Sequence, residues 1–551
     1  MLKILFLCKD YFKKQKFRLA MFILLSLLST VITLIYPYIS GNFIDQLILA
    51  TKDSSGAYII YTFMGILLIS SLLGIGIGFF IERLYTKLQT IAGYSLNKDL
   101  IQHLQRLPLS FTGKQNMAYL NQRINNDANS VVIFFLSFVR NFITNFVLVL
   151  LPLYAVFVFS PFVAVIVIVS LILYYIGYLL FKKLIFNANY QYKESQSAFF
   201  SKLYEQLSNI AFVKRNGLAN EFIMRLDKKF RLLFNKALHL QKVNYAYSGY
   251  DRLLTVLAQI SLMVLGAFQV MNNQLTIGRL TIILSYFSII IGAVRYFFTL
   301  GQAIQENLVS YKRIEELSAI KEESSGNGVL SSVNTIELEH VSFSYFENPL
   351  LNMYNGIFEK GNMYAIVGPN GSGKSTFVNI IAGLFIDEFN GKVLYNGKSI
   401  KELDMPLLLR KDIAICEQEP FLLEETIKYN LTLSDDFKIS DEKLREFTHL
   451  LSMDAYLNSL PEGLDSAINE GSSNLSGGEK QKISLLRTLL KNASVIILDE
   501  PTSALDTESK ENLLNYLKKI KADKIIIAVS HDIEFAQRFD FQIPLDGGKS
   551  H

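Results

Sequence analysis

The chain has 551 residues, of which half are hydrophobic and only 19% are charged, and its mean hydropathy is +0.28. Average soluble domains are about 25% charged, so this composition excludes a disordered chain, a collagen-like fibre and a disulfide scaffold, and it argues against a wholly soluble protein. A net charge of +5 is too small to indicate a nucleic-acid partner, and two distant cysteines, Cys8 and Cys416, provide neither a zinc motif nor a disulfide framework.

Long segments without charge run through the first 304 residues. Four of them contain no Asp, Glu, Lys, Arg or His, namely 19–44, 54–81, 141–181 and 253–278. A fifth segment, 280–304, contains only Arg295. A bilayer core needs about 20 apolar residues per helix, and runs of this length leave no solvated face for a soluble core helix. These segments therefore predict membrane spans.

The segment 141–181 is long enough for two spans, with Pro152 and Pro161 marking a turn between them. The first of these two helices can begin near Val131 and then includes Arg140. We therefore predict six transmembrane helices, at about 19–40, 57–81, 131–150, 157–180, 253–271 and 280–302.

The positions of Lys and Arg predict the orientation of these helices. Basic residues precede the first span, so the N-terminus is expected in the cytosol. The short, nearly uncharged connections, at 41–56, 151–156 and 272–279, are expected outside, and the long charged ones, at 82–130 and 181–252, inside. An even number of crossings returns the C-terminal half to the cytosol. We expect a multi-pass protein of a cell membrane, and the Lys-, Asn- and Ile-rich composition indicates a bacterial source.

A change of composition separates this half from the rest of the chain. Residues 321–334 are rich in Ser, Gly, Asn and charge, which is typical of a linker. After the linker, short apolar runs alternate with helical patterns, as in MYAIVG, SVIILDE and KIIIAVS. Such runs indicate the buried parallel strands of an α/β domain.

The strongest local motif runs from Gly368 to Thr376 and reads GPNGSGKST. It follows an apolar strand pattern, precedes a helix pattern, and matches G-x-x-x-x-G-K-[ST]. Glycines let backbone N–H groups face inward to hold phosphates, and the helix N-terminus adds positive partial charge. Lys374 can reach the β- and γ-phosphates, and the Ser375 hydroxyl can bind Mg²⁺.

Two further motifs follow. The strand pattern VIILDE ends in Asp499, which is placed to hold Mg²⁺, and Glu500, which is placed as the general base for an attacking water. Ser476, Gly477 and Gly478 open a helix pattern in NLSGGEKQ and can present N–H groups to an anion. Alone, the first motif could be an ordinary acidic strand end and the second a plain helix cap.

In this order the motifs resemble those of the ATP-binding-cassette (ABC) transporters, and most of all exporter half-transporters that fuse six helices to one nucleotide-binding domain. The resemblance covers nearly the whole chain, and LSGGE-x-Q is its most specific part. It implies a helical membrane domain over 1–320, the linker 321–334, and an α/β P-loop nucleotide-binding domain over 335–551. ATP and Mg²⁺ are the expected ligands.

The resemblance also assigns roles to single residues. Tyr345 matches the aromatic that stacks on adenine, Gln418 the Q-loop glutamine at Mg²⁺, and His531 the switch histidine at the γ-phosphate. The expected catalytic residues are Glu500, His531 and Lys374, and the expected metal ligands are Ser375, Gln418 and Asp499. The expected nucleotide contacts are Tyr345, Gly368, Pro369, Asn370, Gly371, Ser372, Gly373, Lys374, Ser375, Thr376, Gln418, Ser476, Gly477, Gly478 and Asp499.

In such transporters the signature contacts ATP that is bound to the opposite subunit, so a dimer is expected. It can be a homodimer or a heterodimer with a related half-transporter. By the same resemblance, 503–506 is the D-loop, 107–127 the first intracellular loop with a short coupling helix, and 204–217 the second. The signature departs from many exporters in having Glu479 and Lys482, and the sequence after His531 is short.

The expected function is therefore ATP-driven export of an unidentified amphiphilic cargo, a peptide, a drug or a lipid. An ATP-gated channel or sensor subunit, or a flippase or importer on the same scaffold, are the alternatives. Arg140 and Arg295 lie at membrane depth, where a charge usually faces a cavity or a partner, which would suit an acidic or amphiphilic cargo. The alternatives are snorkelling to the interface and an ion pair with Glu82 or Glu306.

Overall fold

The computed structural model describes residues 1–50, 56–112, 120–345, 348–433, 439–469, 474–503 and 505–545. The chain forms two compact units. The first comprises Met1–Ile101 and Met117–Ala319, and the second comprises Gln102–Asn116 and Ile320–His551.

The first unit is helical. Its helices are α1 (Leu2–Lys13), α2 (Lys16–Ala50), α3 (Gly56–Leu104), α6 (Ala128–Phe159), α7 (Pro161–Ser208), α8 (Ile210–Arg215), α9 (Ala219–Met271) and α10 (Ile277–Ser318), with a π-turn, η1, at Gln122–Asp127. Among the described residues, six helices are long and apolar enough to cross a membrane: α2, α3, α6, α7, α9 and α10. This matches the predicted number of spans.

The boundary between the third and fourth spans differs from the prediction. The connection expected at 151–156 is wrong, because α6 continues through Pro152 to Phe159. The chain breaks at Ser160, whose backbone is extended and whose hydroxyl accepts the N–H of Val163, 3.3 Å away. Pro161 then occupies the first turn of α7, where its missing N–H costs nothing. The break therefore lies at the Ser-Pro pair alone.

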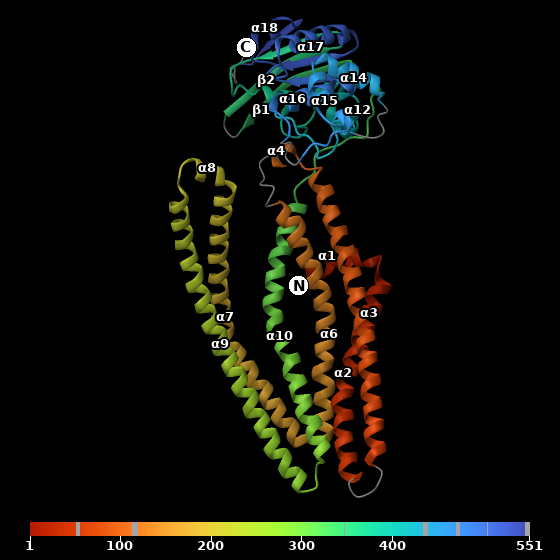
Figure 1. The fold of residues 1–551 in the computed structure, drawn as a ribbon, viewed down its shortest axis with the longest axis vertical. Helices are drawn as coiled ribbons and strands as arrows, with labels where there is room; N and C mark the ends of the chain where they lie inside the picture. The colour runs from red at the N-terminus through yellow and green to blue at the C-terminus, as the bar shows by residue number, and fades with distance from the viewer. Residues whose placement is uncertain are drawn as a thin grey trace. The chain divides into compact units, whose positions relative to one another are not determined.

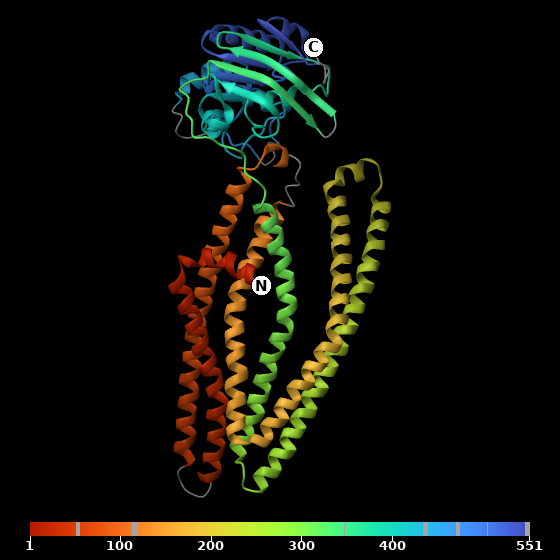
Figure 2. The same ribbon diagram turned by 180° about the vertical axis from the view of Figure 1, so that it is seen from behind.

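Helices α7 and α9 pack along their length and are joined by α8 (Figure 1). Both views show this pair diverging from α6 and α10 towards α8 (Figure 2). At the opposite end, Asp45 of α2 accepts the backbone N–H of Gly278 at 2.8 Å and the Thr276 hydroxyl at 2.6 Å. This carboxylate caps the N-terminus of α10, where negative charge is favoured.

The described residues of the second unit form two sheets. An antiparallel sheet has the order β2-β1-β4-β5, formed by β1 (Thr335–Tyr345), β2 (Asn348–Glu359), β4 (Asn390–Tyr395) and β5 (Lys398–Ser399). A parallel sheet has the order β6-β7-β8-β3-β9, formed by β3 (Met363–Val367), β6 (Ile413–Cys416), β7 (Val495–Asp499), β8 (Ile525–Val529) and β9 (Phe541–Pro544). The three apolar runs noted in the sequence form β3, β7 and β8.

Apart from its exposed edge strand β9, the parallel sheet is buried on both faces, which explains its continuous apolar runs. On one face, Ile366, Ile497 and Ile527 join a core shared with the antiparallel sheet. On the other, Leu498 and Ile526 join a core shared with the helical side of the unit. The predicted fold class, a helical membrane domain followed by an α/β domain, is confirmed.

Short helices complete this unit. They are α4 (Leu109–Thr112), α11 (Lys374–Ile381), α12 (Met405–Lys411), α13 (Ile427–Thr432), α14 (Asp441–Leu450), α15 (Asp454–Ser459), α16 (Gly477–Leu490), α17 (Thr507–Ile520) and α18 (Ile533–Gln537). Among the described residues, three further turns are 3-10 helices, η2 (Ile400–Glu402), η3 (Gly463–Asp465) and η5 (Lys521–Asp523).

Candidate nucleotide-binding site

The carboxyl ends of three neighbouring parallel strands form the candidate site. The loop 368–373 follows β3, Glu500 follows β7, and His531 follows β8. Parallel strands direct their carboxyl ends to one edge of a sheet, which is where ligands bind in open α/β folds. Side chains distant in the sequence therefore meet at this edge.

The loop 368–373 places a buried cation among backbone groups. Gly371 and Gly373 have φ angles of +81° and +91°, which glycine adopts without strain. Lys374 begins α11, and its ammonium donates to the carbonyls of Gly368 and Pro369, each 3.0 Å away. Burial lowers the pKa of Lys374, while the charges of Glu500 and Asp499 act to raise it.

Ser372 shows that this loop suits a polyphosphate. Its hydroxyl is buried and has no hydrogen-bond partner within the described part of the chain. Leaving such a group unsatisfied costs about 1–3 kcal/mol. A phosphate oxygen would accept this hydroxyl and the loop N–H groups together, so the residues present fit the expected ligand.

Asp499 and Ser375 form a pair of oxygen donors. Burial raises the pKa of Asp499, while a hydrogen bond with the Ser375 side chain and the charge of Lys374 act to lower it. Mg²⁺ prefers oxygen ligands and is usually held by one or two carboxylates together with substrate phosphates. The carboxylate and the hydroxyl therefore fit a magnesium ion.

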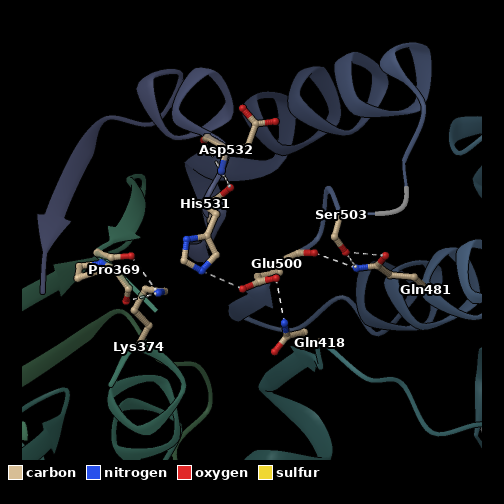
Figure 3. Close-up of polar contacts among 10 residues, drawn as sticks. Pro369, Lys374, Gln418, Gln481, Glu500, Ser503, His531 and Asp532 are labelled. Carbon is tan, nitrogen blue, oxygen red and sulfur yellow. Dashed lines mark hydrogen bonds and ion pairs between the residues drawn. The ribbon is translucent and has the colours of Figure 1, made fainter. Parts of the chain in front are cut away.

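Glu500 is held by two side chains from other strand ends. Gln418 donates its Nε2 to Glu500 Oε2 at 2.9 Å, and His531 Nε2 lies 3.2 Å from Oε1 (Figure 3). The backbone of Glu500 has φ of +49°, a region that is uncommon for a residue with a side chain. Its N–H donates to the carbonyl of Val529 at 3.0 Å, which ties this turn to β8.

Gln481 belongs to the candidate site, although the sequence motifs assigned it no catalytic or binding role. It is almost fully buried on α16, and its amide donates to the carbonyl of Glu500 at 2.8 Å and to the Ser503 hydroxyl at 2.9 Å (Figure 3). It therefore links Glu500, the candidate base, to the expected D-loop. The available signal was its place as the final glutamine of LSGGE-x-Q.

The signature residues form a helix N-terminus. The Ser476 hydroxyl accepts the N–H of Glu479 at 3.3 Å, and the Glu479 carboxylate accepts the N–H of Ser476 at 2.6 Å. This is a capping box, which stabilises the first turn of α16. Among the described residues, no hydrogen bond or ion pair connects Ser476, Gly477 or Gly478 to the loop 368–376.

Some expectations fall partly outside the described residues. Outside them lie the side chain of Tyr345, at the end of β1, the segment 113–119 of the first expected coupling loop, residue 504 of the expected D-loop, and 51–55 of the first expected outside connection. The rest of the first expected coupling loop includes α4, which belongs to the second unit. Near α4, the N–H of Glu323 donates to the Arg106 carbonyl at 2.9 Å. Helix α8 lies within the second expected coupling loop, 204–217.

Both arginines at membrane depth are paired. Arg140 Nη1 lies 3.3 Å from Glu82 Oε1, which confirms the ion pair expected as one alternative. Arg295 forms two hydrogen bonds with Asp251 of α9, at 3.2 and 2.5 Å. Pairing of Arg295 with Glu306 was wrong, because Glu306 instead accepts from Lys193.

Comparisons with known proteins match both units. Residues 19–294 match a family described as the ABC transporter transmembrane region, and residues 351–503 match one described as ABC transporter. Two relatives come from Staphylococcus aureus, strains NCTC 8325 and bovine RF122, and both are named as multidrug export ATP-binding/permease proteins. They are 27% and 26% identical to this chain over 474 residues, which is 83% of this chain and 79% of each relative. The solved structure of a bacterial Atm1-family ABC exporter with ATP bound has a TM-score of 0.83 at 20% identity and covers 97% of this chain and 94% of that one.

Proposed function

Because this chain belongs to the ABC transporter family, we propose that it is an ATP-hydrolysing exporter that moves an amphiphilic cargo out of the cytoplasm of a bacterial cell. One observation carries the proposal. The carboxylate of Glu500 is held between His531 and Gln418 beside the glycine loop, as a general base for hydrolysis must be. The names of the relatives support the direction of transport.

Each residue of the site has a role in this proposal. Backbone N–H groups of 368–373, the Ser372 hydroxyl and the ammonium of Lys374 bind the phosphates. Ser375, Asp499 and Gln418 would hold Mg²⁺, which supplies charge neutralisation at the phosphate oxygens.

Hydrolysis needs one proton to be removed from water. Glu500 accepts this proton while the water oxygen bonds to the γ-phosphorus. The bond from phosphorus to the β–γ bridging oxygen breaks, and its electron pair leaves with ADP. His531, on the other side of the carboxylate, holds Glu500 in place and lies where it can contact the γ-phosphate.

A second subunit completes the site in this proposal. Ser476, Gly477 and Gly478 are assigned to ATP bound on the loop of the opposite subunit, in a homodimer or in a heterodimer with a related half-transporter. A helix N-terminus with exposed N–H groups suits a phosphate anion. Among the described residues, no hydrogen bond or ion pair joins the signature to the loop of its own chain, which supports this assignment.

The test is Glu500→Gln in the full-length chain. Removal of a general base lowers the rate by about 10²- to 10⁴-fold, so ATP hydrolysis should fall by at least about 100-fold while ATP binding remains. The exposed Glu508 on α17 provides the matched control, since Glu508→Gln makes the same chemical change away from Glu500. Unchanged hydrolysis in the Glu500 variant would show that the base is assigned wrongly.

Transport is measured in the same experiment. Inside-out vesicles should accumulate a fluorescent amphiphile when ATP is added, and the Glu500 variant should not. If the amphiphile stimulates ATP hydrolysis but does not accumulate in the vesicles, the channel or sensor alternative is favoured. Movement in the opposite direction would favour an importer, and exchange between leaflets without entry into the lumen would favour a flippase.

A further inference from the structure

A cavity of about 550 Å³ lies among α7, α9 and α10 of the membrane unit. Its wall on α7 includes Lys182 and Lys183, which directly follow the charge-free segment ending at Phe181. The cavity therefore lies where the apolar span of α7 ends, at the boundary between hydrocarbon and water. A ligand in this position can keep one end in each environment.

One wall of the cavity is aromatic. The rings of Tyr178 and Phe298 are stacked, with centroids 4.8 Å apart and an interplanar angle of 9°. Tyr247 of α9 adds a third ring. Aromatic rings provide large apolar surface to a ligand, so this wall suits an alkyl chain or a ring system.

The charge of the cavity is positive. Of the described residues that line it, none is Asp or Glu, and Lys182 and Lys183, both exposed, are the cations. The nearby acids already have partners, since Glu306 accepts from Lys193 and Asp251 accepts from Arg295. Within the described residues, neither Lys182 nor Lys183 forms an ion pair.

From these observations we infer that the cavity binds an amphiphile with an anionic head group, such as a carboxylate or a phosphate, and that it is a cargo subsite of the transporter. The two ammonium groups hold the head, and the stacked rings contact the apolar body. The inference rests on the proposed export function and narrows its cargo class. A transported amphiphile and a resident lipid head group share this chemistry, so the experiment separates them.

Binding is measured with a single tryptophan. The chain contains no Trp, so Phe298→Trp places the only indole in the cavity wall. The full-length variant in phosphatidylcholine liposomes is titrated with 11-bromoundecanoate, whose bromine quenches indole fluorescence. Quenching by the anion should reach a plateau, because the cavity becomes fully occupied. Quenching by 11-bromoundecyltrimethylammonium should rise without a plateau, because this cation only partitions into the bilayer.

The lysines are then neutralised. In the Phe298→Trp background, Lys182→Gln with Lys183→Gln should weaken binding of the anion by about tenfold, because charge-assisted hydrogen bonds are lost. Lys182→Arg with Lys183→Arg should restore it, which excludes misfolding as the cause. Lys228→Gln with Lys229→Gln is the matched control, because this exposed pair on α9 lies outside the cavity. Equal affinity in the first variant and the control, or saturable binding of the cation, would overturn the inference.

Cargo and resident lipid are separated by transport. ATP-driven accumulation of 11-bromoundecanoate in inside-out vesicles, lost in Glu500→Gln and reduced in the lysine-to-glutamine variant, supports a cargo subsite. Lysine-dependent binding without accumulation would overturn the cargo assignment. Absence of ATP-driven transport of every amphiphile would instead contradict the proposed function, and accumulation of only the cationic amphiphile would leave that function intact while refuting this inference.

Discussion

At the scale of single residues, the candidate base is held from several directions. Gln418 and His531 contact the Glu500 carboxylate, and Gln481 contacts its backbone carbonyl. The left-handed backbone at Glu500 is a conformation that the surrounding contacts must maintain. A defect in any of these contacts should therefore affect the position of the carboxylate more than the binding of ATP.

Gln481→Ala tests this positioning. The variant loses hydrogen bonds to Glu500 and Ser503, each worth about 1 kcal/mol. We expect kcat for ATP hydrolysis to fall by about tenfold with little change in KM, since about 1.4 kcal/mol corresponds to a factor of ten. Ser503→Ala should give a smaller loss that is not additive with the first. A rise in KM with kcat unchanged would contradict a positioning role.

The sequence predicted some of these residues and not the contacts among them. The glycine loop and the Asp-Glu pair follow apolar strands, so their place at a strand end could be predicted from pattern alone. The contacts of Gln418 and Gln481 with Glu500 depend on which strands and helices lie side by side, and no local pattern specifies that. Burial of a polar side chain such as Gln481 becomes visible only in the folded structure.

At the scale of elements, the membrane helices show what hydropathy can and cannot predict. Charge-free runs predicted six spans because the bilayer excludes charge. The predicted position of the turn after the third span was wrong. Proline usually interrupts a helix, but the apolar helix α6 continues through Pro152. Ser160 provides the actual signal, a hydroxyl cap followed by proline.

Close helix contact predicts the effect of a mutation at the cap of α10. A Cβ atom at Gly278 would lie 2.0 Å from the carbonyl oxygen of Gly41, a backbone atom that cannot move cheaply. Gly278→Ala should therefore destabilise the membrane unit by about 1–3 kcal/mol, seen as a lower Tm in detergent. Gly292→Ala on the same helix meets open space and should leave Tm unchanged or slightly higher. Equal Tm values for both variants would refute the close contact.

Glu323, in the segment between α10 and β1, makes the stability of the fold depend on pH. Burial, and next the charge of Glu388, raise the pKa of Glu323 to about 7. The folded state then holds this proton more tightly than the unfolded chain, so stability should fall as pH rises from the ordinary carboxyl range through about 7. Glu323→Gln removes the ionisable group and should flatten this fall.

The pH dependence is measured as Tm of the full chain at pH 5 and pH 8. The decrease in Tm between the two values should be smaller for Glu323→Gln than for the wild type. The control is Glu442→Gln, an exposed position on α14, whose decrease should match the wild type. A Glu323 variant that follows the wild-type decrease would show that this carboxyl does not govern it.

At the scale of the whole molecule, the candidate nucleotide site has two parts, the glycine loop and the signature. The loop 368–376 and the signature at Ser476 are each well formed, and no hydrogen bond or ion pair connects them among the described residues. The proposed dimer joins the loop of one subunit to the signature of the other.

Complementation between subunits tests this assembly. Lys374→Ala and Ser476→Arg should each abolish hydrolysis in a homodimer, because each damages both composite sites. Co-expression of the two variants should recover activity, since one mixed site then combines an intact loop with an intact signature. Copurification of the double variant with a tagged wild-type chain should give mixed dimers with no activity. Full activity of a solitary subunit would refute the dimer.

The same separation of loop and signature has a genetic consequence. In the proposed dimer, a chain that carries defects in both elements disables its own nucleotide and also the one bound by its healthy companion. An intact allele would then fail to mask such a defective allele, because most assemblies would include at least one faulty copy. In the proposed dimer, an allele with defects at both Lys374 and Ser476 is therefore expected to cause a dominant loss of transport.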